Sequence, residues 1–152
     1  MSEAYTPDSI LKKLETPEEC DQFAINIRDK YPEVAKRAKR RSVELRALQF
    51  GAVSPLEREA LEVIYAYEAV LAERNKRKTA ATRTWQMIER HGIRDAIERA
   101  VSRETDPLGF LALREMGMED LTFEELVLRH PEQFSEAAVH RSKTRLEKYR
   151  AQ

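Results

Sequence analysis

Residues 79–101, TAATRTWQMIERHGIRDAIERAV, contain the one tryptophan of the chain and its clearest helix end. Ala81, Trp85 and Ile88 recur at spacings of four and three, which places them on one face of a helix. Gly92 is expected to end that helix, because glycine has no Cβ to clash in the left-handed conformation that closes helices. The apolar pattern resumes directly after it. The stretch therefore predicts two helices that meet at a glycine corner, with the rest of the chain packed around them.

The composition predicts an all-α protein. The chain has 152 residues, of which 36% are charged and 7% are aromatic, and it contains four glycines. Many charges with few aromatic residues favour helices that have solvated, ion-paired faces. No segment alternates apolar and polar residues as a half-buried strand does. We therefore expect a single compact domain, residues 1–152, of seven to nine helices arranged as a bundle or an irregular array.

Capping residues and prolines divide this chain into helices. Thr6, Thr16 and Ser54 each precede a proline, which suits the first position of a helix. The first of them predicts a short helix over 6–15, for which a peripheral position is open. The longest apolar stripe runs from Pro55 to about residue 74, and we expect it at the centre of the core. Other helices are expected over 16–31, 32–50, 106–116, 122–130 and 135–149.

The motifs of common enzyme classes do not occur in the sequence. It has no nucleotide-binding glycine loop, no His-Glu-x-x-His, no pair of cysteines and no nucleophile elbow. His91 and Asp95 have the spacing of two metal ligands on one helix, but Gly92 interrupts that helix. A stable metal site also needs three or four ligands. We therefore expect a non-enzymatic protein with no metal site and no cofactor.

The sequence also predicts where the protein acts. Cys20 is the one cysteine, so no internal disulfide can form. No apolar run approaches the roughly 20 residues that a membrane helix needs. The N-terminus MSEAYTPDS lacks the basic and apolar regions of a signal peptide. We expect a cytoplasmic, intracellular protein with no membrane partner.

Charges are sorted along the chain although the formal net charge is zero. Basic residues outnumber acidic residues in 28–46 and in 74–103, whereas acidic residues dominate 104–136. Sorting of this kind gives patches of opposite sign if the helices place the segments on separate faces. The alternative is that the segments neutralise one another within the fold. The sequence leaves both possibilities open.

The basic segments favour a nucleic-acid-binding protein. Segments 36–41 and 74–83 are rich in lysine and arginine, and threonines near the second can donate hydrogen bonds to phosphate. A helix N-terminus beside that segment offers further backbone N–H groups. Asp95 and Glu98 on the helix after the corner argue against a DNA-reading helix-turn-helix. The candidate nucleic-acid-binding residues are Lys36, Arg37, Arg40, Arg41, Lys76, Arg77, Lys78 and Arg83.

The acidic segment 115–132 supports an alternative hypothesis. It would make the protein an adaptor or inhibitor that docks on a basic protein partner, through Glu119, Asp120, Glu124 and Glu125. Carboxylates on a surface helix are also typical of ordinary solvated faces. The sequence leaves open the choice between DNA, RNA and protein as the partner, and it leaves homo-oligomerisation open.

Three stretches resemble known proteins. The segments RTWQMIERHGI (83–93) and EELVLRHPEQFS (124–135) look like parts of small, uncharacterised all-helical bacterial proteins. This resemblance implies a bacterial origin and brings no function with it. Residues 23–45 are similar to one tetratricopeptide-type helical pair. Such repeats need about three copies to bury their faces, and no second copy follows at a fixed period.

Overall fold

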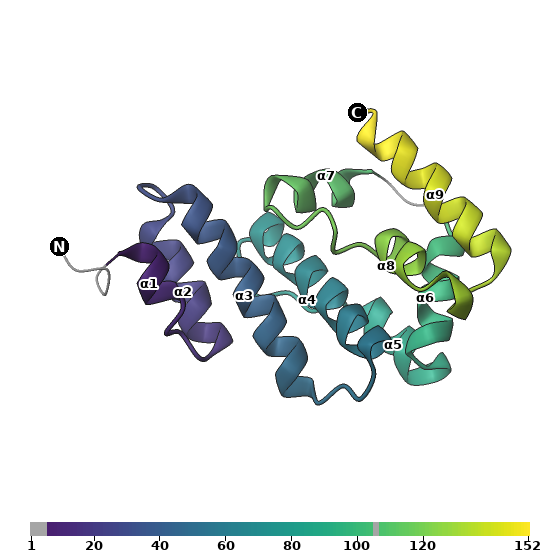
Figure 1. Ribbon diagram of the computed structural model, residues 1–152, viewed down its shortest axis with the longest axis horizontal. Coiled ribbons are helices and arrows are strands. Elements are labelled where there is room, and N and C mark those ends of the chain that lie inside the picture. Colours follow the sequence, from purple (N-terminus) through teal and green to yellow (C-terminus); the bar gives the residue numbers. More distant parts are fainter. Residues whose placement is uncertain (1–5, 105–106) are drawn as a thin grey trace. The chain divides into compact units, whose positions relative to one another are not determined.

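The computed structural model describes residues 6–104 and 107–152, which form an all-α protein (Figure 1). These residues contain nine α-helices, one short 3₁₀ helix and no strand. The predicted fold class is therefore confirmed. Packing divides the chain into two compact units, Met1–Gly51 and Ala52–Gln152. The single-domain organisation stays a prediction, and each unit is described separately below.

The first unit is a helical hairpin with one short additional helix. Its helices are α1 (Pro7–Leu11), α2 (Pro17–Ile27) and α3 (Pro32–Phe50). α2 and α3 pack against each other along their small side chains, which include the buried Ala24, Ala35 and Ala38. α1 is shorter than the predicted helix over 6–15, and it packs Leu11 into the same apolar cluster. Small side chains at this contact let the two longer helices approach closely.

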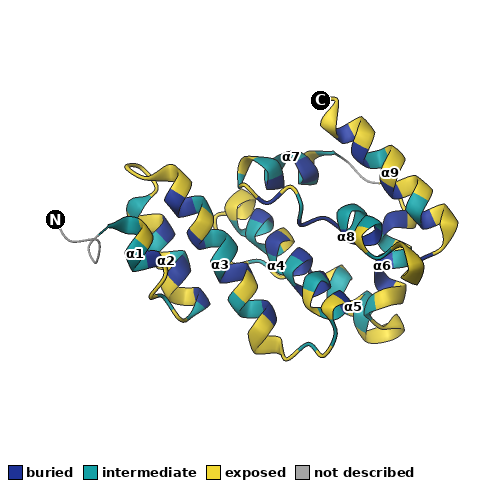
Figure 2. Ribbon diagram, viewed as in Figure 1, coloured by how far each residue is buried: buried dark blue, intermediate teal, exposed yellow. Residues whose placement is uncertain are grey.

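The second unit is built around its longest helix. Its elements are α4 (Pro55–Asn75), α5 (Thr82–His91), α6 (Ile93–Ser102), α7 (Leu108–Glu115), α8 (Phe123–Arg129), η2 (Pro131–Gln133) and α9 (Glu136–Arg150). α4 packs against α6, α7 and α8, as its apolar stripe predicts. On this helix Ala66 and Val70 are buried, whereas Tyr67 is 42% exposed. Figure 2 shows that α4 carries both buried and exposed residues along its length.

One apolar cluster joins four helices of the second unit. Its buried members are Leu56, Ala60, Ile97, Val101, Leu126, Val127, Phe134 and Ala138. They come from α4, α6 and α8, from the end of η2 and from the start of α9. Phe134 precedes the cap of α9, and Val139 packs against the same cluster, as a hydrophobic staple requires. The buried face of α6 therefore packs against α4, α8 and α9.

Most helix boundaries follow the predicted caps. Five helices begin at a residue whose side-chain oxygen accepts a hydrogen bond from a backbone N–H three residues later: Thr6, Thr16, Ser54, Thr122 and Ser135. The predicted helix start at Asp106 lies outside the described residues, and α7 begins at Leu108. Within the described ranges, no helix combines the length and the apolar character that crossing a membrane requires.

Candidate functional site

Gly92 joins α5 to α6 without an intervening loop. Its backbone has φ +82° and ψ 166°, a combination that is essentially restricted to glycine. The Gly92 N–H donates to the Ile88 carbonyl at 2.8 Å, and the Gly92 carbonyl accepts from the Ala96 N–H at 3.0 Å. The last turn of α5 and the first turn of α6 thus share one residue. This confirms the predicted glycine corner, but Gly92 has an extended ψ and is not in the left-handed helical conformation that was expected.

A carboxylate of α4 holds the start of α5. The same oxygen of Glu68, Oε2, accepts a hydrogen bond from the Ala81 N–H at 2.8 Å and from Trp85 Nε1 at 2.7 Å. The Tyr65 ring lies 5.7 Å from the Trp85 ring, between centroids. Trp85 is half-buried. Because its indole N–H is bound to Glu68, Trp85 serves as an anchor between helices.

Two arginines of α9 hold the end of α6. Arg141 Nη1 donates to the Ser102 carbonyl at 2.8 Å, and Arg145 donates to the Arg103 carbonyl. The last carbonyls of a helix have no partner within the helix and carry the negative end of its dipole. Arg141 and Arg145 of α9 supply hydrogen-bond donors to these carbonyls and positive charge to this end of the dipole. The α5–α6 pair is therefore fixed at its start, by Glu68, and at its end.

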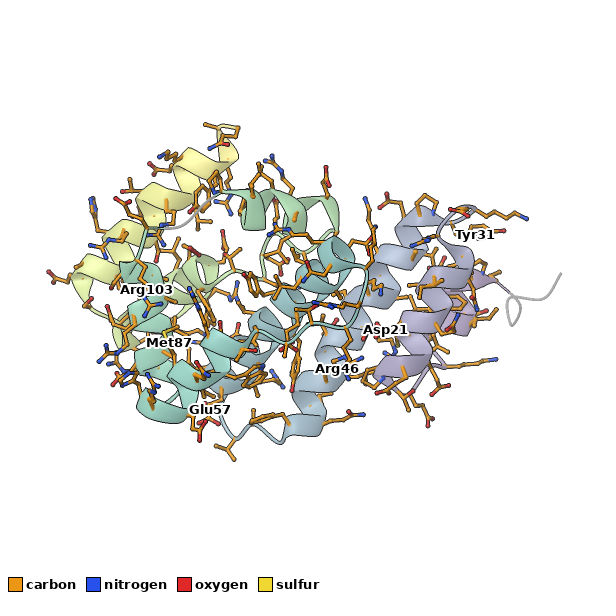
Figure 3. The ribbon with its side chains drawn as sticks, turned by 180° about the vertical axis from the view of Figure 1, so that it is seen from behind. Asp21, Tyr31, Arg46, Glu57, Met87 and Arg103 are labelled. Atoms are coloured by element: carbon orange, nitrogen blue, oxygen red, sulfur yellow. The ribbon has the colours of Figure 1, made fainter. Side chains whose placement is uncertain are left out.

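The outer faces of α5 and α6 line a cleft of about 280 Å³. The α5 residues that line it lie on one helical face, at spacings of three, four and seven: Arg83, Gln86, Met87 and Arg90. Arg99 and Arg103 line it from α6 and from the residue after α6, four positions apart, and His91 completes the lining at the corner. Figure 3 labels Met87 on α5 and Arg103 directly after α6. The corner at Gly92 brings the two faces together.

The cleft carries positive charge that the described residues do not neutralise. Its lining contains four arginines and no aspartate or glutamate. Arg83, Arg90, Arg99 and Arg103 are exposed, and none has an ion pair with a carboxylate of the described residues. Like charges that line one concave surface raise the local potential and attract anions. The α5–α6 cleft is therefore a candidate anion-binding site.

The loop before α5 adds further cations. Lys76 caps α4 in the left-handed conformation, with φ 58°, and lies 3.9 Å from the Glu73 carboxylate. Arg77 and Lys78 are exposed and have no ion pair with a described residue. Thr79 fixes the loop by donating to the Arg77 carbonyl at 3.0 Å. Of the eight predicted nucleic-acid-binding residues, only Arg83 lines the cleft, and Lys76, Arg77 and Lys78 lie on the loop that leads to it.

The basic side chains of the other predicted segment, 36–41, pair with residues of the first unit. Lys36 lies 3.5 Å from the Glu33 carboxylate, and Arg40 lies 3.9 Å from that of Glu44. Arg37 pairs with Asp8. Arg41 donates to the Leu14 carbonyl through Nε at 2.9 Å and through Nη2 at 2.7 Å. These side chains bind their own chain, so they are less available to a partner.

Two of the four residues of the predicted acidic site have ion-paired carboxylates. Arg145 Nη1 lies 3.4 Å from Glu124 Oε1, and the two side chains are 11% and 12% exposed. Arg150 pairs with Glu125. Arg129 donates to the Asp120 carbonyl at 3.2 Å, whereas Glu119 is exposed. Two of the four carboxylates proposed to contact a protein partner thus stabilise the contact between α8 and α9.

A metal or nucleophilic site would use the histidines and the cysteine of the described residues. Within the described residues, no group of three or more His, Cys, Asp or Glu side chains could hold a metal ion. His91 lines the cleft, and His130 pairs with Glu59 of α4. Cys20 is fully buried, and this burial raises the pKa of its thiol. A buried, protonated thiol is a poor nucleophile.

Sequence reasoning missed three of the four arginines in the cleft. Arg90, Arg99 and Arg103 stand apart from the dense basic run that ends at Arg83. Their spacing could have shown that Arg83 and Arg90 share one face of α5 and that Arg99 and Arg103 share one face of the next helix. These two faces approach each other because of the backbone conformation at Gly92. The positions of charged residues in the sequence do not show that conformation.

Comparisons with known proteins do not identify a relative. No protein-family model, no curated protein and no solved structure matches the chain. The resemblance of residues 83–93 and 124–135 to bacterial proteins stays an expectation from the sequence. Function is therefore inferred from the geometry and charge of the α5–α6 cleft.

Proposed function

We propose that the protein binds nucleic acid through phosphate groups held in the α5–α6 cleft. The observation that supports this proposal is the set of four arginines that line one concavity without a carboxylate among the lining residues. Guanidinium groups present a planar fork of N–H donors that matches two phosphate oxygens. In this proposal the protein is a non-enzymatic, cytoplasmic binding protein, and the arginines provide affinity rather than chemistry.

The loop before α5 extends the same proposal to a longer ligand. Arg77 and Lys78 are exposed and lie within six residues of Arg83 in the sequence. A polynucleotide carries regularly spaced phosphates, so separate cations can each neutralise one of them and release its counterions. Contacts of this kind position a strand without reading its sequence. We therefore propose binding that depends weakly on base sequence and strongly on salt.

The protein-binding alternative has less support. Its residues Glu124 and Glu125 already pair with Arg145 and Arg150, so docking on a basic partner would compete with the contact between α8 and α9. Breaking an ion pair that is almost buried leaves a charge without compensation, at a cost of about 3–5 kcal/mol. Of the other two residues of this hypothesis, Glu119 is exposed and Asp120 is partly buried. The alternative remains as an outcome of the following experiment.

The experiment is a salt titration of binding to labelled single-stranded DNA, single-stranded RNA and duplex DNA, followed by fluorescence anisotropy. The parent protein should bind at least one of them at about 50 mM salt, and log affinity should fall linearly with log salt. Arg99→Glu should weaken binding about tenfold or more and flatten the salt slope by about one. Lys148→Glu is the matched control, since Lys148 is exposed on α9, outside the cleft lining, and changes the charge equally.

The outcomes separate the two functions. Loss of binding in Arg99→Glu with near-parental binding in Lys148→Glu supports the cleft. Equal loss in both variants means that overall charge, and not the cleft, controls binding. A parent protein that binds no nucleic acid at about 50 mM salt removes the proposal, since phosphate contacts are strongest at low salt. Capture of a basic protein that is lost on charge reversal of Glu119 and Asp120 would then favour the adaptor.

A further inference from the structure

The cleft is small and partly open to solvent. Its volume is about 280 Å³, whereas sites for drug-sized ligands span about 300–1,000 Å³. The space therefore suits one phosphate group with part of its nucleoside rather than several nucleotides. Other phosphates of a strand would have to lie outside it. The loop that carries Arg77 and Lys78 leads into α5 and offers cations for such phosphates.

The charge of the cleft exceeds the charge of one internal phosphate. Four arginines line this space, and the described residues supply none of them with an ion-pair partner. An internal phosphodiester carries a single negative charge. A terminal phosphomonoester carries about −1.5 to −2 at neutral pH and three strong acceptor oxygens. A terminal phosphate therefore matches both the density of positive charge and the number of guanidinium donors better.

We propose that the cleft captures the terminal phosphate of a nucleic-acid strand. This inference rests on the proposed nucleic-acid binding and specifies which part of the strand enters. Arg83 and Arg90 of α5 bind the phosphate from one side, and Arg99 and Arg103 bind it from the other. Gln86 offers an amide to the sugar or base, and Met87 offers an apolar surface that suits the nucleoside. The cations of the preceding loop bind phosphates further along the strand.

The experiment compares two oligonucleotides of the same sequence, one with a 5′-phosphate and one with a 5′-hydroxyl, both labelled at the 3′ end. A matched pair with a phosphate or hydroxyl at the 3′ end, labelled at the 5′ end, tests the other terminus. We expect one terminal phosphate to raise affinity about tenfold, the effect of one good charge-assisted contact. The preference should disappear in Arg99→Glu and persist in Lys148→Glu. A free nucleoside monophosphate is the competitor that represents the small-molecule source of the same chemistry.

Each outcome decides the inference. Equal affinity for the phosphorylated and hydroxyl strands, with loss of both in Arg99→Glu, overturns terminal capture and leaves nucleic-acid binding intact. A preference that survives Arg99→Glu places its origin outside the cleft and also overturns the inference. A free monophosphate that binds as tightly as the phosphorylated strand identifies a nucleotide as the ligand, against strand-end capture. Failure of every strand to bind removes the proposed function together with the inference.

Discussion

The two basic regions of this protein differ in what their cations contact. On α3, Lys36, Arg37, Arg40 and Arg41 bind carboxylates or a carbonyl of the first unit. On α5 and α6, the arginines of the cleft have no ion pair with a described carboxylate and line a concave surface. The first region has the denser run of charges in the sequence, whereas the second has the better arrangement for an anion. The density of charge along a chain is therefore a poor guide to a binding site.

The physical cause of this difference is where acceptors lie around each helix. Lys36 and Arg40 pair with Glu33 and Glu44 of α3 itself, and Arg37 pairs with Asp8 of α1. The lining faces of α5 and α6 both carry arginine, so each helix faces cations of the other. Repulsion between them is tolerated because the apolar side of α6 is fixed by Ile97 and Val101. Apolar packing on one side thus maintains a charged cleft on the other.

Replacing Ile97 with alanine should have the largest effect on stability. Ile97 is 1% exposed and packs in the cluster that joins four helices. Loss of burial together with the cavity that remains should cost about 2–5 kcal/mol of unfolding free energy, measured by urea denaturation. Ile25→Ala is the control, because Ile25 is 50% exposed on α2 and should change stability by about 0.5 kcal/mol or less. Similar midpoints for the two variants would mean that α6 is not anchored as described.

Replacing Gly92 with alanine should have the next largest effect. No atom lies within 4 Å of the Cβ that the substitution adds, so the cost comes from the backbone conformation alone. We expect a loss of about 1–3 kcal/mol, measured by thermal and urea unfolding. Gly109→Ala is the matched control, since its added Cβ also meets no atom and Gly109 lies inside α7. That substitution should be neutral or stabilising, because alanine favours helix. A Gly92→Ala protein as stable as Gly109→Ala would contradict the strained corner.

Replacing arginines one at a time should show the smallest effect and compare the regions directly. Arg41→Ala removes two hydrogen bonds to the Leu14 carbonyl, so it should cost about 1–2 kcal/mol of unfolding free energy. Arg99→Ala should change stability by no more than about 0.5 kcal/mol, because Arg99 is exposed and binds no described carboxylate. The unfolding free energies are measured by urea denaturation. If both variants lose the same unfolding free energy, Arg41 does not stabilise the fold more than Arg99 does.

The fold follows from local patterns of the sequence, and the cleft does not. The caps at Thr16 and Ser54 and the stop at Gly92 depend on neighbouring residues, so the sequence predicts them. The pairing of Arg37 with Asp8 joins residues that lie far apart along the chain. The same holds for Arg145 with Glu124. Such long-range contacts decide which charges stay available, and one sequence without its packing does not show them.

The most direct measurement compares two double variants in the same salt titration of nucleic-acid binding. Arg90→Gln with Arg99→Gln neutralises two cations of the cleft, and Arg37→Gln with Arg40→Gln neutralises two cations of α3. We expect the cleft variant to lose about tenfold or more in affinity, with a salt slope lower by about two. The α3 variant should lose less than about twofold, because its cations lie outside the cleft lining and have Asp8 and Glu44 as partners. Equal losses, or a greater loss in the α3 variant, would contradict the assignment of binding to the α5–α6 cleft.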